Sequence, residues 1–228
     1  MNIDYKKYPT PRMRHHTAPN LYVPFNEFKV LPRYYPPILP VIEWGKYFSD
    51  SAPPTALDIG CGRGGFLLEY ALQHPHVNIF GVEVRKQAVE WIDSIIKGEK
   101  LPNAGVEWYN TTNGLPFISS HSVDSIFYFF PDPWHKKKHH KRRAFNLNLV
   151  NEIYRTLKPN GTLYLMTDVE EVDVYQQEVL NVHNGFIFKY VTDDEWHLPR
   201  TDHENFSIKK NIPYIRAIVS KREDFSDN

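Results

Sequence analysis

A strand, a glycine-rich turn and the start of a helix follow one another in Leu57-Asp58-Ile59-Gly60-Cys61-Gly62-Arg63-Gly64-Gly65-Phe66. Glycine lets the backbone turn tightly and approach a ligand closely. A dinucleotide site uses such glycines to seat a pyrophosphate on the helix N-terminus. Here Asp58 precedes the first glycine by two positions, and its charge would repel a pyrophosphate. An acid at this place suits a ligand with a cationic amino group, such as S-adenosylmethionine.

Strands and helices alternate beyond this turn. We expect strands at 55–59, 78–82, 106–109, 123–129, 162–166, 186–190 and 214–220, and helices at about 37–48, 65–73, 86–97, 145–157 and 172–182. The alternation predicts an α/β fold with a doubly wound, mostly parallel sheet. Because no long helix separates the last two strands, they predict an antiparallel hairpin at one edge. Pro159-Asn160-Gly161 is expected to be a turn, and residues 192–213 a long polar loop.

The chain divides into an N-terminal arm at residues 1–40 and one domain at residues 41–228. Residues 1–10 are expected to be a disordered tail. The aromatic and aliphatic residues from Tyr22 to Tyr35 predict that this part of the arm docks on the domain, while Arg12 to His16 forms a basic cluster.

Composition sets the broad class of the protein. Hydrophobic residues make up 41% and charged residues 24%, as in ordinary globular proteins. Cys61 is the only cysteine, so no intramolecular disulfide is possible, no cysteine metal cluster is expected, and a cytoplasmic location fits. Met1 to Thr10 lacks the apolar core of a signal peptide, and no apolar run approaches membrane-spanning length.

Two further polar residues follow the expected strands. Glu83 ends the second strand, where a carboxylate commonly accepts hydrogen bonds from both ribose hydroxyls of a nucleoside. Asn110 follows the third strand and would either meet an adenine edge or form a simple strand-end turn. Gly60 and Gly62 alone would also fit a turn without a ligand. Together with Asp58, these residues predict a site for S-adenosylmethionine.

An acid between two prolines follows the fourth strand, in Phe129-Phe130-Pro131-Asp132-Pro133-Trp134-His135-Lys136. The prolines should stiffen the loop around Asp132. Residues 136–143, here called the basic tract, hold six of the 27 lysines and arginines and no acid, although the net charge is +0. A rigid acid beside a polycation suggests that a polyanion is brought to a reactive pocket. The alternative is a surface turn followed by a solvated charge run. Trp134 would either stack on a base or pack under the loop, and packing is favoured.

These residues together resemble the bacterial tRNA (guanine-N7-)-methyltransferase family. The resemblance covers residues 55–220 and is strongest over residues 130–143. Thr167-Asp168-Val169-Glu170 and Thr201-Asp202-His203-Glu204 match two further segments, although an aromatic residue is more usual where His203 stands. The resemblance implies a Rossmann-like methyltransferase domain at 41–228, S-adenosylmethionine as cofactor, and methylation of a variable-loop guanosine in tRNA.

The resemblance also implies roles for single residues. It places the cofactor and catalytic pocket at the glycine turn and at Asp58, Glu83, Asn110 and Asp132, with Asp132 as the catalytic residue. It implies contacts with the tRNA from Lys136, Asp168, Thr201 and Glu204. Asp168 would alternatively be the N-cap of the next helix, and Thr201 and Glu204 part of an ordinary polar loop. A monomer and a homodimer both stay open, as does the need for a partner subunit.

Three other functions compete with this one. A methyltransferase for another RNA or a small molecule would share the cofactor site, but the basic tract argues against a small substrate. A non-catalytic RNA-binding subunit would not need Asp58, Glu83 and Asp132. A nicotinamide-dependent dehydrogenase is disfavoured by Asp58, and the chain shows no obvious catalytic Tyr-Lys or His arrangement.

Overall fold

A seven-stranded sheet with the strand order β3-β2-β1-β4-β5-β7-β6 runs through the protein. The computed structural model describes residues 3–13 and 19–222. The strands are β1 Ala56–Ile59, β2 Ile79–Glu83, β3 Ala104–Trp108, β4 Val123–Phe129, β5 Leu157–Thr167, β6 Phe186–Tyr190 and β7 Ile215–Lys221. Strands β1 to β5 pair in parallel, and β7 is antiparallel to both β5 and β6. This confirms the expected doubly wound sheet with an antiparallel edge.

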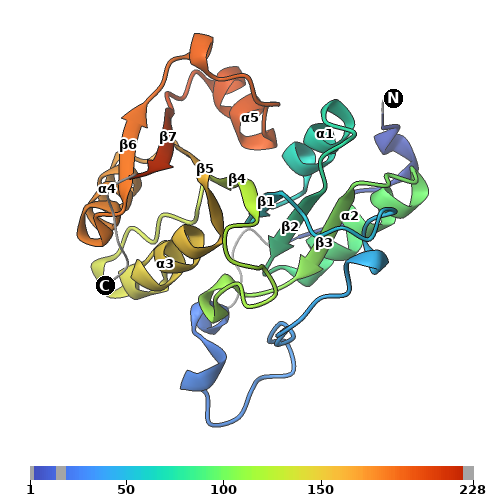
Figure 1. Ribbon diagram of the computed structural model, residues 1–228, viewed down its shortest axis with the longest axis horizontal. Coiled ribbons are helices and arrows are strands. Elements are labelled where there is room, and N and C mark those ends of the chain that lie inside the picture. The colour runs from blue at the N-terminus through green and yellow to red at the C-terminus, as the bar shows by residue number, and fades with distance from the viewer. Residues whose placement is uncertain (1–2, 14–18, 223–228) are drawn as a thin grey trace.

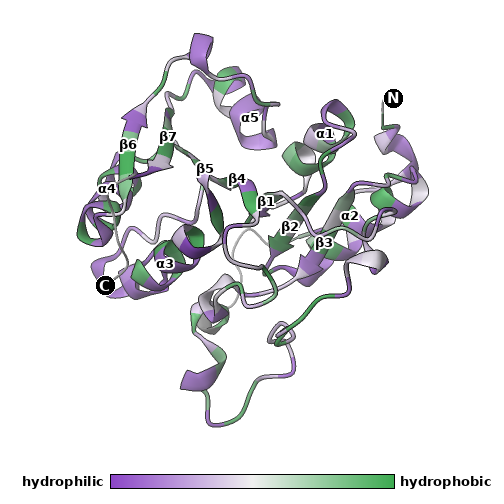
Figure 2. Ribbon diagram, in the orientation of Figure 1, coloured by the Kyte–Doolittle hydropathy of each residue, from purple (hydrophilic) through white to green (hydrophobic). Residues whose placement is uncertain are grey.

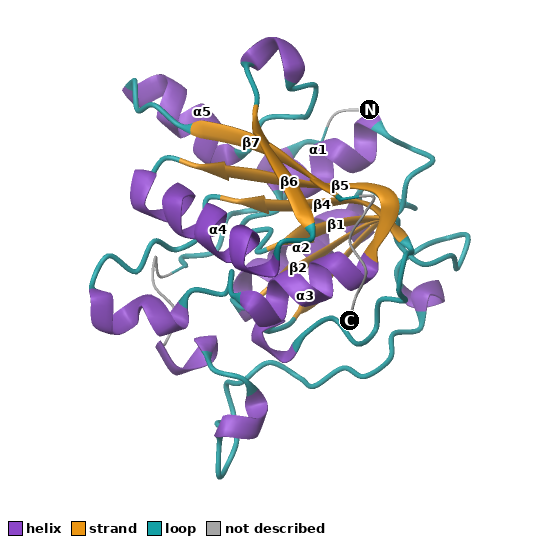
Figure 3. Ribbon diagram, turned by 60° about the vertical axis from the view of Figure 1, so that its left-hand side comes forward, coloured by secondary structure: helices purple, strands orange, loops and turns teal. Residues whose placement is uncertain are grey.

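Helices cover both faces of the sheet, as Figures 1 and 3 show. They are α1 Gly65–Gln73, α2 Lys86–Gly98, α3 Leu147–Thr156, α4 Glu170–His183 and α5 Asp202–Lys210. Because side chains alternate along a strand, Ile79 joins the core beneath α1 and α2, whereas Phe80 joins the core shared with α3 and α4. Figure 2 shows this as apolar strands inside and polar outer helix faces. Within the described residues no helix is both long and apolar enough to cross a membrane.

Local sequence explains why α1 and α3 begin where they do. Gly64 precedes α1 with a φ of 72°, and a β-carbon at this position would lie 2.7 Å from Ile92. Only glycine combines that conformation with such close packing. Asn146 caps α3, its side chain accepting from the Leu149 N–H at 3.1 Å.

The helix expected at residues 37–48 is wrong. The structure contains only a 3₁₀ turn there, at Trp44–Lys46. Pro40 prevents a helix from running through from residue 37, because proline lacks an N–H and its ring clashes with the preceding turn, and Gly45 weakens a helix over the remaining residues. Aromatic packing replaces the helix: Trp44 lies edge-on to Phe80 at 5.1 Å and stacks on Phe48 at 6.0 Å. An irregular segment therefore covers this part of the sheet.

The expected long loop at 192–213 is also wrong, because α5 and a 3₁₀ turn at Asp193–Glu195 lie inside it. Thr201 caps α5 and accepts from the Glu204 N–H at 2.9 Å, while the Glu204 carboxylate accepts from the Thr201 N–H at 2.7 Å. This capping box is a helix-start signal that the sequence carries. Residues 159–161, expected to be a turn before a strand, are instead part of β5, which has an irregularity there: its pairing with β4 jumps from Val123–Leu157 to Ser125–Thr162.

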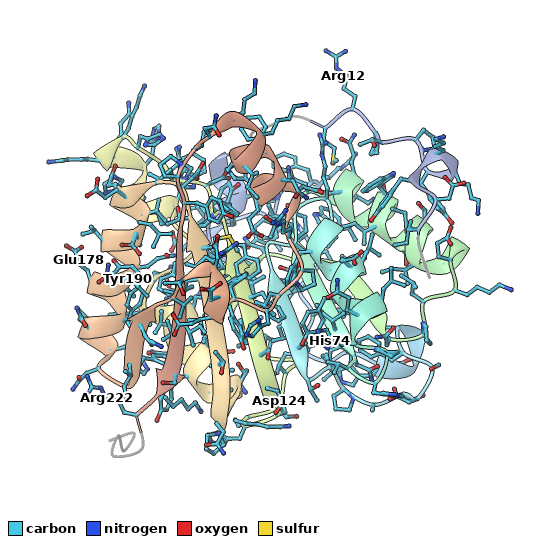
Figure 4. The ribbon with its side chains drawn as sticks, turned by 90° about the horizontal axis from the view of Figure 1, so that it is seen from above. Arg12, His74, Asp124, Glu178, Tyr190 and Arg222 are labelled. Carbon is cyan, nitrogen blue, oxygen red and sulfur yellow. The ribbon has the colours of Figure 1, made fainter. Side chains whose placement is uncertain are left out.

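The arm departs from expectation at its start and agrees with it further on. Residues 3–10 are not a disordered tail, because Tyr5 stacks on Trp91 at 6.3 Å and the Tyr8 hydroxyl donates to Glu99 at 2.8 Å. The arm segment, residues 21–35, docks on the domain as predicted, with Leu21 and Tyr35 both buried. In the basic cluster, Arg12 projects outward (Figure 4), and residues 14–18 lie outside the described residues.

Candidate active site

The carboxyl ends of β1, β2 and β4 enclose a cavity of about 280 Å³. Ligands of open α/β sheets bind in the crevice at this edge, where the strand order reverses. In this sheet the reversal lies between β1 and β4. The lining of the cavity includes Tyr22, Gly60, Glu83, Arg85, Asn110, Asp132, Trp134 and Arg142.

Asp58 is a buried acid that lacks a partner on one oxygen. It is 3% exposed, and its Oδ2 accepts no hydrogen bond from the described residues. Burial, and then the charge of Glu83, raise the pKa of Asp58 to about 8. A buried polar atom without a partner is costly, so the site favours a ligand that brings a donor or a positive charge. The residues present therefore fit the ammonium group of S-adenosylmethionine.

The glycine turn leaves space beside this acid. Gly60 and Gly62 have φ values of 76° and 62°, which L side chains rarely adopt. No atom lies within 4 Å of a β-carbon built at Gly60. Cys61 between them is buried, as expected for a small packing residue. The backbone at Gly60 is thus open to a ligand.

Glu83 is held by residues on both sides of it. Its carboxylate is 5% exposed and accepts from the Gly62 N–H at 2.9 Å, from the Arg85 N–H at 2.9 Å and from Arg85 Nε at 3.0 Å. The sequence interpretation did not single out Arg85. Its place two residues after a strand-end acid was the available signal. Ribose hydroxyls would share the Glu83 carboxylate with this guanidinium, and binding of the ribose stays a prediction.

Asn110 is tied to the arm segment. Its Nδ2 donates to the Leu21 carbonyl at 2.7 Å and to the Tyr35 hydroxyl at 2.8 Å, and its Oδ1 accepts from the Thr112 N–H at 3.1 Å. The strand-end turn is therefore present. Contact with an adenine stays a prediction, and it would have to coexist with these bonds.

The Asp132 loop, residues 130–134, is strained at both ends. Phe130 and Trp134 have φ values of 46° and 45°, in the left-handed region. Such conformations cost about 1–3 kcal/mol each and persist where the surroundings hold them. Asp132 itself is exposed, and its Oδ2 accepts from the Tyr22 hydroxyl at 2.5 Å. The sequence interpretation missed Tyr22, because 110 residues separate the two partners.

Trp134 packs rather than standing free, as the sequence interpretation favoured. Its ring lies edge-on to Tyr22 at 5.0 Å, and the Arg142 guanidinium lies over it at 5.1 Å. Both contacts are of the favourable aromatic and cation–π kinds. Trp134 and Arg142 thereby close one side of the cavity next to Asp132.

The basic tract contains two kinds of cation. Lys136, Lys137 and Lys138 are exposed and could meet phosphates. Arg143 is 6% exposed and donates to the Pro133 carbonyl and to Glu171. The expectation that the whole tract binds phosphates stays a prediction, and for Arg143 the structure argues against it, because Nε and Nη2 already donate to acceptors inside the protein.

Asp168 lies directly after β5 and pairs with His203 of α5, with Oδ2 and Nε2 2.9 Å apart. The N-cap interpretation of Asp168 is wrong, because the N-cap of α4 is Val169. The His203 ring also packs against Phe130 in a tilted arrangement, with 4.2 Å between ring centres. This side chain therefore connects Asp168 to the Asp132 loop.

Thr201 and Glu204 are buried in the capping box of α5. Glu204 is 0% exposed, and its Oε1 accepts from Arg216 at 2.8 Å. The interpretation of these residues as an ordinary polar loop is wrong. Their contact with tRNA stays a prediction. In the structure they stabilise the start of α5, the helix whose His203 pairs with Asp168.

The fold and site define a class of protein. Residues 52–220 match a family described as "Putative methyltransferase". The fold is similar to that of precorrin-6y C5,15-methyltransferase from Geobacter metallireducens, with a TM-score of 0.53, 16% identity and 74% and 80% of the two chains covered. It is also similar to a SAM dependent methyltransferase from Aquifex aeolicus, with a TM-score of 0.50, 18% identity and 74% and 81% covered. The chain thus belongs to a methyltransferase family and has a Rossmann-like fold.

Curated relatives narrow the class. A tRNA (guanine-N(7)-)-methyltransferase of Microcystis aeruginosa is 30% identical over 200 residues, covering 83% of this chain and 93% of the relative. One of Lactobacillus gasseri is 32% identical over 171 residues, covering 75% and 76%. The chain belongs to the tRNA (guanine-N(7)-)-methyltransferase family.

Proposed function

We propose that the protein transfers a methyl group from S-adenosylmethionine to N7 of a guanosine in the variable loop of tRNA. The observation that supports this most is the placement of two acids at one sheet edge: buried Asp58 near the carboxyl end of β1, with no partner on Oδ2, and exposed Asp132 in the loop after β4. The names of the relatives provide the substrate. Residues 41–228 act as the methyltransferase domain, and the arm borders its site.

Four residues on the cofactor side would hold S-adenosylmethionine. Asp58 would accept from the ammonium group, Glu83 from the ribose hydroxyls, and Gly60 and Gly62 would let the backbone approach. When bound, the cofactor supplies an electrophilic methyl group. A cation at Asp58 would also stabilise the ionised form of this carboxyl, which burial disfavours.

The substrate side has to position the guanine. Guanine N7 carries a free lone pair and no proton, so no general base is needed. Alignment of N7 with the methyl group can lower the barrier by about 7–11 kcal/mol in well-oriented systems. Asp132 would accept from guanine N1–H and N2–H and would stabilise the positive charge that develops on the purine. Adenine offers no equivalent pair of donors.

The remaining expected residues would hold the rest of the tRNA. Lys136, Lys138 and Arg142 would bind phosphates, which gives affinity with little sequence information. Asp168 would read the guanine edge together with Asp132. Thr201 and Glu204 would support this side through α5. A tRNA substrate and a single cysteine are consistent with a cytoplasmic location.

The test is incubation of the protein with S-adenosylmethionine and unmodified tRNA, followed by mass spectrometry of the nucleosides. We expect 7-methylguanosine from the wild type and at least 100-fold less from Asp132→Ala, with tRNA binding retained. Cofactor binding without any methylated nucleoside would refute the proposed substrate. Normal turnover with lost tRNA binding in Asp132→Ala would refute the role of Asp132.

A further inference from the structure

We infer that Arg143 is a positioning residue that holds the Asp132 loop in its reactive geometry, and that it does not bind RNA. This inference rests on the role proposed for Asp132. Arg143 donates to the Pro133 carbonyl from Nε at 3.1 Å and from Nη2 at 2.9 Å. Pro133 is the residue directly after Asp132, so the guanidinium fixes the peptide group at the exit of the loop.

The loop needs such a support because it cannot provide its own. Pro131 and Pro133 have no backbone N–H, so neither can donate a hydrogen bond to close the loop. Phe130 and Trp134 on either side are in the left-handed region. The upstream end is tied to the sheet by the Phe130 N–H, which donates to the Met166 carbonyl at 2.7 Å. Arg143 is the corresponding tie at the downstream end.

Arg143 is itself anchored on α4. Its Nη2 donates to Glu171 at 2.7 Å, and its guanidinium lies over the Tyr175 ring at 4.7 Å. The hydrogen bond from Arg143 also lowers the pKa of Glu171. Since α4 begins two residues after Asp168, the guanidinium couples the Asp132 loop to the segment that carries this second acid. A planar fork can hold a carbonyl and a carboxylate together, whereas lysine provides a single ammonium.

Burial separates this role from phosphate binding. The Arg143 side chain is 5% exposed, whereas Lys136 and Lys138 of the same basic tract are exposed. Because Nε and Nη2 are engaged in these bonds and the side chain is almost fully buried, a phosphate has little access to the guanidinium. Replacement of Arg143 should therefore change turnover, whereas replacement of the lysines should change the salt-dependent binding of tRNA.

The test compares Arg143→Lys with Arg155→Lys. Arg155 is a matched control: it donates to the Leu115 and Ile118 carbonyls at 2.9 and 2.8 Å and to Glu152 at 2.8 Å, outside the residues that line the cavity. We expect Arg143→Lys to lower kcat at saturating tRNA about 10- to 100-fold, the size of effect that misplacement by about 1 Å can cause. The Kd for tRNA, its salt dependence and the Kd for the cofactor should stay at wild-type values. Arg155→Lys should keep the wild-type kcat.

Each other outcome decides against the inference. Weaker tRNA binding with a reduced salt slope and unchanged kcat would make Arg143 a phosphate ligand. An equal loss of kcat in Arg155→Lys would make the effect one of general destabilisation. If Arg143→Lys does not fold, Glu171→Gln decides: it should lower kcat several-fold with unchanged tRNA binding, and unchanged kcat overturns the inference. Failure of the proposed function differs from all of these, because the wild type would then form no 7-methylguanosine.

Discussion

The cofactor side and the substrate side of the cavity are built in opposite ways. On the cofactor side, Asp58 and Glu83 lie near the carboxyl ends of neighbouring parallel strands, with Asp58 paired to Gly81, and the contacts of Glu83 come from within the same βαβ unit. On the substrate side, Asp132 lies in a strained loop and is bonded to Tyr22 from the arm. Arg143, the last residue of the basic tract, supports the same loop.

The difference shows where the site can change shape. Asp58 is buried in the sheet, so the free energy of its ionised form depends on whether a ligand brings a positive charge. Asp132 is exposed and already accepts a hydrogen bond from Tyr22, so its contribution to substrate binding depends on which donor it accepts from. Replacements on the cofactor side should therefore alter binding strongly, and replacements around Asp132 should alter turnover and the competition for its carboxylate.

The largest effect is expected from Asp58→Asn. The free protein should become more stable at pH 7, because a buried acid without a partner is replaced by a neutral amide of the same shape. The cofactor should bind about 100-fold more weakly, because an amide cannot pair with the ammonium group, and breaking a buried charge pair costs about 2–5 kcal/mol. Thermal melting measures the change in stability, and calorimetric titration measures the affinity for the cofactor. A less stable variant with wild-type cofactor affinity would contradict the assignment.

The pH dependence should follow the raised pKa of Asp58, about 8. An acid with a raised pKa stabilises the fold most at low pH, so the free protein should lose stability as pH rises from its unfolded pKa towards 8. Binding of a cation favours the ionised acid, so the cofactor Kd should fall by up to about tenfold per pH unit between pH 6 and 7.5. Calorimetry in buffers of different ionisation enthalpy would detect the released proton. A pH-independent Kd, or the same slope in Asp58→Asn, would contradict this.

The sequence indicated the sheet well because its signals are local. The glycine turn, the apolar strands and the apolar spacing of α3 each lie within about a dozen residues, and the structure has them within a few residues of the expected bounds. The errors arose where a local signal was overridden or not used. Pro40 interrupted an apolar run that otherwise reads as a helix, and the Thr201–Glu204 capping box was treated as a motif without its structural meaning as a helix start.

The same reasoning explains the site. Asp58 and Glu83 lie near the carboxyl ends of β1 and β2, and Asp132 follows β4. Because these strand ends lie at one edge of the sheet, the convergence of the three acids was predictable. The bond from Tyr22 to Asp132 and the inward turn of Arg143 depend on tertiary packing of distant segments, which periodicity does not report. In the basic tract, the lysines are exposed and Arg143 is buried. The only sequence signal for the burial of Arg143 was the apolar pair Ala144-Phe145 that follows it.

The smallest effect, and the sharpest test of the substrate side, is expected from Tyr22→Phe. The Tyr22 hydroxyl uses Asp132 Oδ2, an acceptor that the guanine edge would need, at 2.5 Å. To bind Asp132, the guanine has to replace the hydrogen bond from Tyr22, and one such bond contributes about 0.5–1.5 kcal/mol net. Removal of the hydroxyl should therefore lower the KM for tRNA about two- to tenfold. Tyr8→Phe is the matched control, since its hydroxyl, also on the N-terminal arm, donates to Glu99 at 2.8 Å and both residues lie outside the cavity lining. It should not lower the KM. A raised KM or reduced kcat in Tyr22→Phe alone would mean that the arm assists Asp132 instead of competing with the guanine for it.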